Sequence, residues 1–268
     1  MKSASVLIST YNRPYALQRV LEGLNQQDLP ANEIIIGDDG STPDTKAVID
    51  RWRSAGLPIQ HCWHEDKGYR KTIIMNRAIQ AATSDVLIFL DGDCVPLSSF
   101  VQDHLKMHEP GCIHAGPRML ASPRLTKQIE SDGFEAKSIW FWLRARIRGD
   151  INRLAPLIRL PDGPWRKRTP FKWELVRGCN FSVERHAVLA IDGFEGSLFG
   201  WGPDDSDMAV RLINNGLTVK NLRFAAPVVH LWHREEDRGR LQENLAYLQE
   251  ALHERRISAR AGLSSLSA

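Results

Sequence analysis

The chain has 268 residues, of which 43% are hydrophobic and 25% are charged, as in an ordinary globular protein. This length allows one large α/β domain or two small ones. The 19 glycines and 14 prolines form no repeat, which excludes fibrous and disordered classes. A net charge of +3 is too small for general nucleic-acid binding, so we expect no nucleic-acid partner.

The cysteines are too far apart for a CxxC zinc motif or a dense disulfide framework: Cys62, Cys94, Cys112 and Cys179. We therefore expect reduced thiols and a cytoplasmic setting. The sequence shows neither a charged-then-apolar leader nor a long apolar run. It predicts a protein that is not exported and does not span a membrane.

Short β-branched runs alternate with amphipathic stretches over the first 120 residues. We expect helices from Pro14, from Pro43 and over 70–82, with strands at 5–9, 33–37, 59–63 and 86–90. This βαβαβαβ order favours a mostly parallel sheet covered by helices, an α/β fold. Ligands of such sheets bind at the carboxyl ends of the strands.

The alternating rhythm stops over about residues 121–173 and resumes with strands up to His233 and a helix over 204–214. A polar amphipathic helix is expected over 237–256, followed by a mobile Ser/Ala tail. We therefore predict a binding half (1–120), a second half of the same domain (121–236) and a terminal helix with tail (237–268).

Three acidic clusters fall where this architecture places ligands: DDGS at 38–41, DGD at 91–93 and DDSD at 204–207. Carboxylates two apart at a strand end can share a divalent cation. The first cluster fits a tight turn at least equally well. The third also fits a helix start, although one Asp would suffice there. The second favours a ligand site, because crowded carboxylates repel each other unless something neutralises them.

A pair of imidazoles, His230 and His233, follows a strand-like stretch near the end of the chain. Histidines three apart can reach one ion in a turn or helix, but they point to opposite faces of an extended strand. The sequence leaves this geometry open. It has no GxxxxGK[ST] motif and no GxGxxG after a strand, so the P-loop and dinucleotide fingerprints are absent.

Four stretches together resemble glycosyltransferase family 2: SVLISTYNRPYAL, IIIGDDGS, FLDGDCV and VRGCNFSVERHAVLAIDGFEGSLFGWGPDDSDMAVRL. The similarity covers about residues 5–233, and its most specific part resembles the WG-acidic-acidic motif of galactosyltransferase-like enzymes. The resemblance implies inverting nucleotide-sugar chemistry on a GT-A fold. That fold has a Rossmann-like, mostly parallel central sheet flanked by helices, here one compact domain with an inserted acceptor-side segment.

The resemblance implies a metal site and a donor site. Asp93 would hold Mn²⁺ or Mg²⁺ with His233, alone or together with His230. Asp39 would accept a hydrogen bond from the uracil of a UDP-sugar. The implied nucleotide-sugar contacts are Thr10, Tyr11, Asn12, Asp39, Arg70, Lys71, Asn76, Arg77, Asp91, Trp201 and Gly202.

Within the same resemblance, Asp205 is the catalytic base and Asp204 binds donor or acceptor hydroxyls. Two residues depart from the family pattern: Asp204 stands where Glu is usual, and Pro203 stands where Gly is usual. The neighbouring helix start should keep Asp205 ionised at neutral pH.

The predicted function is metal-dependent transfer of a hexose from a UDP-sugar to a saccharide or glycolipid acceptor, in bacterial surface polysaccharide or lipopolysaccharide synthesis. Two alternatives remain. FLDGDCV also resembles a phosphohydrolase loop whose first Asp is the nucleophile, although that loop normally lies near the chain start and continues with Thr at the position of Cys94. The other alternative is a non-catalytic nucleotide-sugar or carbohydrate-binding protein.

The segment 138–173 combines basic residues with aromatics. Its nine basic residues face only Asp150 and Asp162, which gives +7, and it carries four of the eight tryptophans. We expect either an acceptor-side flap or a patch for peripheral membrane contact at the inner face of the plasma membrane; a solvated basic face with core aromatics is the alternative. The basic residues are Arg144, Arg146, Arg148, Arg153, Arg159, Arg166, Lys167, Arg168 and Lys172.

Overall fold

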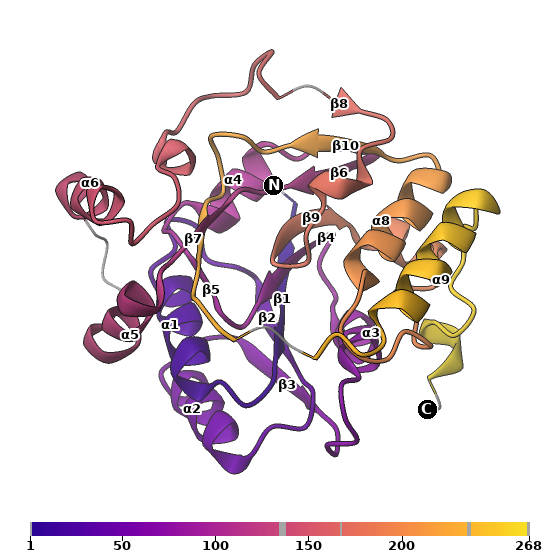
Figure 1. Cartoon of the computed structure of the whole chain (residues 1–268), viewed down its shortest axis with the longest axis horizontal. Coiled ribbons are helices and arrows are strands. Elements are labelled where there is room, and N and C mark those ends of the chain that lie inside the picture. Colours follow the sequence, from indigo (N-terminus) through magenta and orange to yellow (C-terminus); the bar gives the residue numbers. More distant parts are fainter. Residues whose placement is uncertain (1, 134–137, 167, 235–236, 267–268) are drawn as a thin grey trace.

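The computed structural model describes residues 2–133, 138–166, 168–234 and 237–266 (Figure 1). Strands and helices alternate through its first part as the sequence predicts, because apolar runs and amphipathic stretches follow one another there. These elements are β1 (Ala4–Thr10), α1 (Pro14–Asn25), β2 (Glu33–Asp38), α2 (Pro43–Ser54), β3 (Ile59–Trp63), α3 (Lys71–Ala81) and β4 (Val86–Asp91).

The second part has shorter strands, which run in mixed directions. Its strands are β5 (Cys94–Pro96), β6 (Cys112–Ala115), β7 (Arg118–Leu120), β8 (Arg168–Thr169), β9 (Asn180–Glu184), β10 (Thr218–Asn221) and β11 (Val228–His230). Its helices are α4 (Phe100–Lys106), α5 (Pro123–Asp132), α6 (Ile139–Ile147), α7 (Arg185–Ala190), α8 (Asp204–Asn214) and α9 (Leu241–His253), with 3-10 turns at η1 (Ala155–Leu157), η2 (Trp173–Leu175) and η3 (Leu263–Ser265).

The central sheet has eight strands in the order β3-β2-β1-β4-β9-β6-β10-β8. The first four run parallel, and β9 lies antiparallel between β4 and β6. This is the α/β fold that the sequence predicts, with a mixed, mostly parallel sheet. The predicted division into two halves at residue 120 stays a prediction.

Side chains of the sheet alternate between two apolar layers. Along β1, Val6 and Ile8 pack in one hydrophobic cluster with Leu17 of α1, whereas Leu7 packs in the other with Ile79 of α3. A strand covered on both faces must be apolar throughout, which explains the unbroken hydrophobic runs. Figure 1 shows α1 and α2 on one side of the sheet and α3 and α8 on the other.

A second, small sheet has the order β5-β11-β7. In it β11 runs antiparallel to β5, and the register pairs His230 with Cys94. Cys94 directly follows the DGD motif, so this pairing carries His230 to the end of β4. A segment from late in the chain thereby reaches the edge of the parallel sheet where ligands are expected.

The C-terminal part differs from the sequence prediction in two ways. The helix α9 begins at Leu241 and packs against α8, which is later than the expected start at 237. The tail is packed as far as residue 266: Leu263 is 8% exposed, and the Ser264 amide donates to Asp192 Oδ1 over 2.9 Å. Residues 267–268 lie outside the described residues. Within the described chain, every helix is too short or too polar to cross a bilayer.

Candidate active site

A cavity of about 920 Å³ opens at the carboxyl ends of β1, β2 and β4. Most of the predicted site residues line it, although they come from six separate parts of the chain. The predicted residues on its walls are Thr10, Tyr11, Asp39, Lys71, Asp91, Asp93, Trp201, Gly202, Asp204, Asp205, His230 and His233.

The ammonium group of Lys71 lies among three carboxylates. Its Nζ is 3.4 Å from Asp91 Oδ1, 3.4 Å from Asp204 Oδ2 and 3.8 Å from Asp205 Oδ1. Burial alone would lower the pKa of Lys71, but the carboxylates hold it well above its ordinary value. Asp91 also accepts from Ser9 Oγ over 2.8 Å. Although burial opposes it, Lys71 keeps the pKa of Asp91 below its usual value.

Asp205 is the carboxyl whose proton affinity the fold changes most clearly. Burial, and then the charge of Asp204, raise the pKa of Asp205 to about 7. The expected effect of the helix start is therefore overridden by desolvation. Asp205 Oδ2 accepts from the Gly178 amide over 2.8 Å. A Cβ at position 178 would lie 2.2 Å from that oxygen, so only glycine allows the approach.

The metal residues that the sequence suggests converge on Asp93. His230 Nε2 lies 3.8 Å from Asp93 Oδ1, and His233 Nε2 lies 3.5 Å from Asp93 Oδ2. Burial lowers the pKa of His230, which favours the neutral imidazole that binds metals. Carboxylate oxygen with imidazole nitrogen suits Mn²⁺, so the donor set fits the divalent metal that the sequence predicts. Arg13 Nη1 meanwhile donates to Asp93 Oδ2 over 2.7 Å.

Asp39 is a buried residue of the cavity wall, and both of its carboxylate oxygens have partners. Oδ1 is 2.6 Å from His64 Nε2, and Oδ2 accepts from the Arg70 amide over 2.8 Å. Burial raises the pKa of Asp39 in spite of these partners. Nearby, Tyr11 donates its hydroxyl hydrogen to Asp66 Oδ2 over 2.9 Å. The Asp39–His64 contact was not predicted, because the spacing of the two residues in the sequence does not indicate that they meet.

Four of the suggested donor contacts lie outside the described lining of the cavity. Asn76 is buried, and its amide exchanges two hydrogen bonds with the backbone of Phe194, at 2.8 and 2.7 Å. Its polar groups are thus already used within the fold. Arg77 is exposed on α3. Asn12 Oδ1 accepts from the Thr42 amide, which ties two loops together, and Arg70 donates to the Glu65 carbonyl oxygen.

Two members of the acidic clusters have structural roles. Asp38 accepts from the Ser41 amide over 2.8 Å and contacts His61, as the tight-turn interpretation predicts. Asp207 forms an ion pair with Arg211 at 2.8 Å, with both side chains fully buried. The surplus of negative charge at the start of α8 therefore resides in Asp204 and Asp205.

Several residues of the site were missed by the sequence reasoning. Arg118 and Arg177 line the cavity, and Arg238 lies 4.9 Å from the ring of Trp201. Asn244 of α9 donates to the carbonyl oxygens of Phe199 and Trp201, which fixes the WG loop. Arg13 also lines the cavity and was missed. It is the one missed residue that the sequence could have indicated, because it directly follows the suggested Thr10–Asn12 stretch.

Two family models match the chain. The model described as glycosyl transferase family 2 matches residues 5–156, and one described as the N-terminal domain of galactosyltransferase matches residues 166–234. The DGD motif falls in the first match and the Asp204–Asp205 pair in the second. The cavity is therefore shared between the two matches.

Curated relatives include two glucosyltransferases. Validoxylamine A glucosyltransferase of Streptomyces hygroscopicus subsp. jinggangensis is 26% identical over 234 residues, which is 80% of this chain and 52% of that enzyme. GalNAc(5)-diNAcBac-PP-undecaprenol beta-1,3-glucosyltransferase of Campylobacter jejuni is 26% identical over 52% of this chain and 45% of its own length. The chain thus spans about half the length of these two relatives.

Two solved structures share the fold. Mannosyltransferase PcManGT from Pyrobaculum calidifontis, in complex with GDP-Man and Mn²⁺, has a TM-score of 0.59 at 18% identity, over 87% of this chain and 58% of that one. GalNAc-T7 with UDP, GalNAc and Mn²⁺ has a TM-score of 0.62 at 15% identity, over 88% of this chain and 44% of that one. The α/β architecture is therefore that of the GT-A structures.

The contacts of Asp205 predict how its titration responds to its neighbours. Lys71→Met removes the positive charge, so the pKa of Asp205 rises above about 7, whereas Asp204→Asn removes a like charge and lowers it. Lys71→Arg keeps the charge and serves as the control. Carbon-13 NMR titration of the Asp205 carboxyl measures all three variants. Shifts of the same sign in Lys71→Met and Asp204→Asn would contradict this electrostatic account.

Proposed function

The chain belongs to glycosyltransferase family 2, and we propose that it moves a hexose, with inversion, from a UDP-sugar to a hydroxyl of a saccharide or lipid-linked acceptor. One observation carries this proposal: the DGD carboxylates and the Asp204–Asp205 pair line the same cavity, with Lys71 between them. Because the family match includes the FLDGDCV stretch, we set aside the phosphohydrolase alternative. The non-catalytic alternative is addressed by the Asp205 variants below.

The proposed donor site lies at the carboxyl ends of β1, β2 and β4. Tyr11 and Asp39 border the end of the cavity that we assign to the base, and Asp91 the part assigned to ribose and diphosphate. Asp93, His230 and His233 would hold the divalent metal. When bound, the metal offsets the negative charge that develops on the leaving diphosphate.

Asp205 is the proposed general base. An acceptor hydroxyl gives its proton to an Asp205 oxygen, its own oxygen bonds to the anomeric carbon, and the bond to the diphosphate oxygen breaks with its electron pair. A base works best when its pKa lies near the working pH, and burial raises that of Asp205 to about 7. Lys71 and the Gly178 amide hold the Asp205 carboxylate in place. Asp204, which also contacts Lys71, is proposed to bind sugar hydroxyls.

The proposed acceptor side includes α6, where a lipid-linked acceptor would lie at the membrane. Trp140, Arg144 and Ile147 follow an i, i+4, i+7 spacing and are exposed, Ile147 by 84%. Arginine beside tryptophan is the composition of interfacial helices. The C. jejuni relative is named for an undecaprenol-linked acceptor, which also supports a lipid-linked acceptor here. Bacterial surface polysaccharide or lipopolysaccharide synthesis is the corresponding pathway proposal.

The basic segment is less uniform than its sequence suggests. Arg166 is buried and donates to carbonyl oxygens, while Arg159 and Arg168 are bound to Asp103 and Glu109. Trp142 packs in the core, as the solvated-face alternative predicts for part of the aromatics. Lys167 lies outside the described residues. We therefore confine the proposed lipid-facing surface to α6.

Asp205→Asn keeps the size of the side chain but cannot accept the proton. Transfer from the UDP-sugar should therefore fall by roughly 10²–10⁴-fold, the usual share of general acid–base catalysis, while donor binding persists. Asp204→Asn should instead raise KM. Initial rates with a matched donor and acceptor measure both. Near-normal transfer by Asp205→Asn would move the base to another residue, and a product with retained configuration would reject the mechanism.

UDP should bind more tightly with Mn²⁺ than without it, because a cation held by Asp93 and the two histidines would offset the charge of the diphosphate. Asp93→Ala should remove this gain and weaken UDP affinity by roughly 10–100-fold. Changing residues that only support the direct ligands of a metal already costs this much. Calorimetry with UDP and with GDP measures the effect and the base preference. Asp50→Ala on α2 is the matched control. UDP affinity that is indifferent to EDTA would contradict the metal assignment.

Removing charge from α6 should weaken binding to anionic vesicles. Each basic residue near such a surface contributes about 1 kcal/mol, so Arg144→Gln with Arg148→Gln, the exposed residue one turn later at the end of α6, should cost roughly 2 kcal/mol, or about 30-fold in partitioning. Sedimentation with anionic and neutral vesicles, at low and high salt, measures this. Lys46→Gln with Arg53→Gln on α2 removes equal charge elsewhere. Equal binding to both vesicle types would reject the membrane surface.

A further inference from the structure

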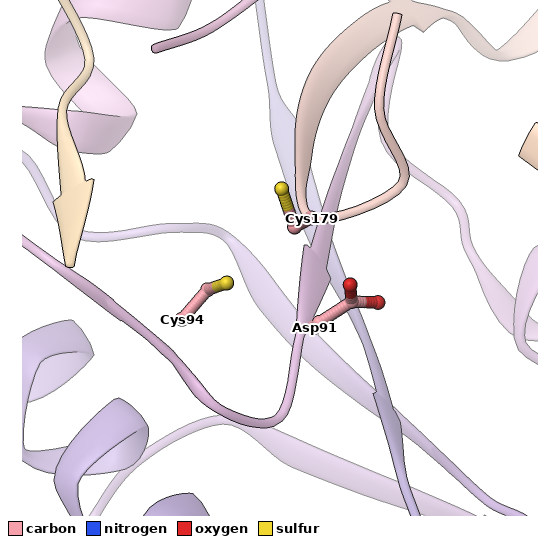
Figure 2. A group of neighbouring side chains, drawn as sticks. All are labelled: Asp91, Cys94 and Cys179. Atoms are coloured by element: carbon pink, nitrogen blue, oxygen red, sulfur yellow. The ribbon is translucent and has the colours of Figure 1, made fainter. Parts of the chain in front are cut away.

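Two buried thiols lie beside the cavity. Cys94 begins β5 directly after Asp93, and Cys179 immediately precedes β9. One ligand atom each of Asp91, Cys94 and Cys179 lie within 4.8 Å of one another. Figure 2 shows Asp91 and Cys94 at the two ends of one short loop and Cys179 on a different segment of the chain. Local sequence brings the first two residues together, and the fold adds Cys179.

The sulfur of Cys94 belongs to a second group as well. It lies within 4.8 Å of a ligand atom of Asp93 and of one of His230. The thiol donates to Asp93 Oδ1 over 3.6 Å. The oxygen–nitrogen set around Asp93 therefore has a sulfur atom at its border, and the Asp91 group shares that sulfur.

Both thiols pack in the hydrophobic core, as buried cysteines commonly do, and each has a polar neighbour as well. Cys94 contacts a carboxylate, and Arg118 Nη1 donates to Cys179 Sγ over 3.6 Å. A guanidinium beside a sulfur offsets the charge of the thiolate, which is the form that ligates metals. The arginine thus favours ligation at Cys179, whereas burial and the neighbouring carboxylates raise the pKa of the Cys94 thiol, so the proposal depends on the geometry of the group.

We propose that Asp91, Cys94 and Cys179 form a site for a thiophilic divalent cation such as Zn²⁺. Zinc takes sulfur at about 2.3 Å and oxygen at about 2.0–2.2 Å, so tetrahedral neighbours lie roughly 3.8 Å apart or closer. Ligand atoms within 4.8 Å need to approach one another by about 1 Å. The thiol protons leave to solvent, water fills the fourth position, and no oxidation or reduction takes place.

This site differs in chemistry from the site at Asp93. Thiolates select zinc over manganese and magnesium, which prefer oxygen ligands. Asp91 belongs both to this site and to the proposed active site, because it contacts Lys71 and, if the proposed function holds, the donor. A zinc ion held by the two sulfurs and Asp91 would compete with both contacts, so Zn²⁺ should inhibit the Mn²⁺-supported reaction.

Cobalt titration of the full chain tests the site without any transfer assay. Co²⁺ bound by thiolates gives a near-ultraviolet charge-transfer band that oxygen and nitrogen ligands do not give. The wild type should develop this band with one Co²⁺ per chain and lose it when Zn²⁺ is added. Cys94→Ser and Cys179→Ser should each lose most of it, whereas Cys62→Ser, a thiol outside the group, should keep it.

Zinc K-edge X-ray absorption of the wild type supplies a second measurement, which needs no variant to fold. Two sulfur neighbours at about 2.3 Å are expected. Absence of the cobalt band, its persistence in either serine variant with native melting, or a zinc shell without two sulfurs would overturn the site. A sulfur-ligated metal in a protein that, freed of zinc and supplied with Mn²⁺, still transfers no sugar would instead reject the proposed function and leave this site standing.

Discussion

The ammonium group of Lys71 holds the two sides of the cavity together. It is placed at the first turn of α3, yet its three carboxylate partners belong to β4 and to α8, which are more than a hundred residues apart in sequence. Without a cation among them, Asp91, Asp204 and Asp205 would repel one another in a poorly hydrated place. The mutual position of the two sides therefore depends on one charge.

The same cluster illustrates a competition between two electrostatic effects. A helix start stabilises negative charge, which by itself would keep Asp205 acidic. Desolvation and the neighbouring Asp204 act in the opposite direction and are larger here, so the pKa of Asp205 is raised to about 7. Burial is a property of the folded chain. The sequence pattern around Asp205 therefore predicted the wrong direction for the shift of its pKa.

Much of the fold was predictable because its signals are local. Apolar runs such as Val86–Leu90 and helix starts such as Pro43 carry their own information, and acidic residues after strands mark the ligand edge. Residues whose roles arise only from tertiary contacts were not predictable. Gly178 looks like any loop glycine until Asp205 lies against it, and Asn76 resembles a ligand contact until the Phe194 backbone takes its amide.

The pairing of β11 with β5 has a consequence for how this chain can vary. Because side chains alternate along a strand, sliding β11 by one position would turn His230 away from Asp93 and present Val229 or Leu231 there instead. The ligand geometry is thus encoded in backbone pairing as well as in the histidine itself. Insertions or deletions between Phe224 and His230 should be tolerated only in ways that restore the alternation, whereas loops remote from this ribbon are free to change length.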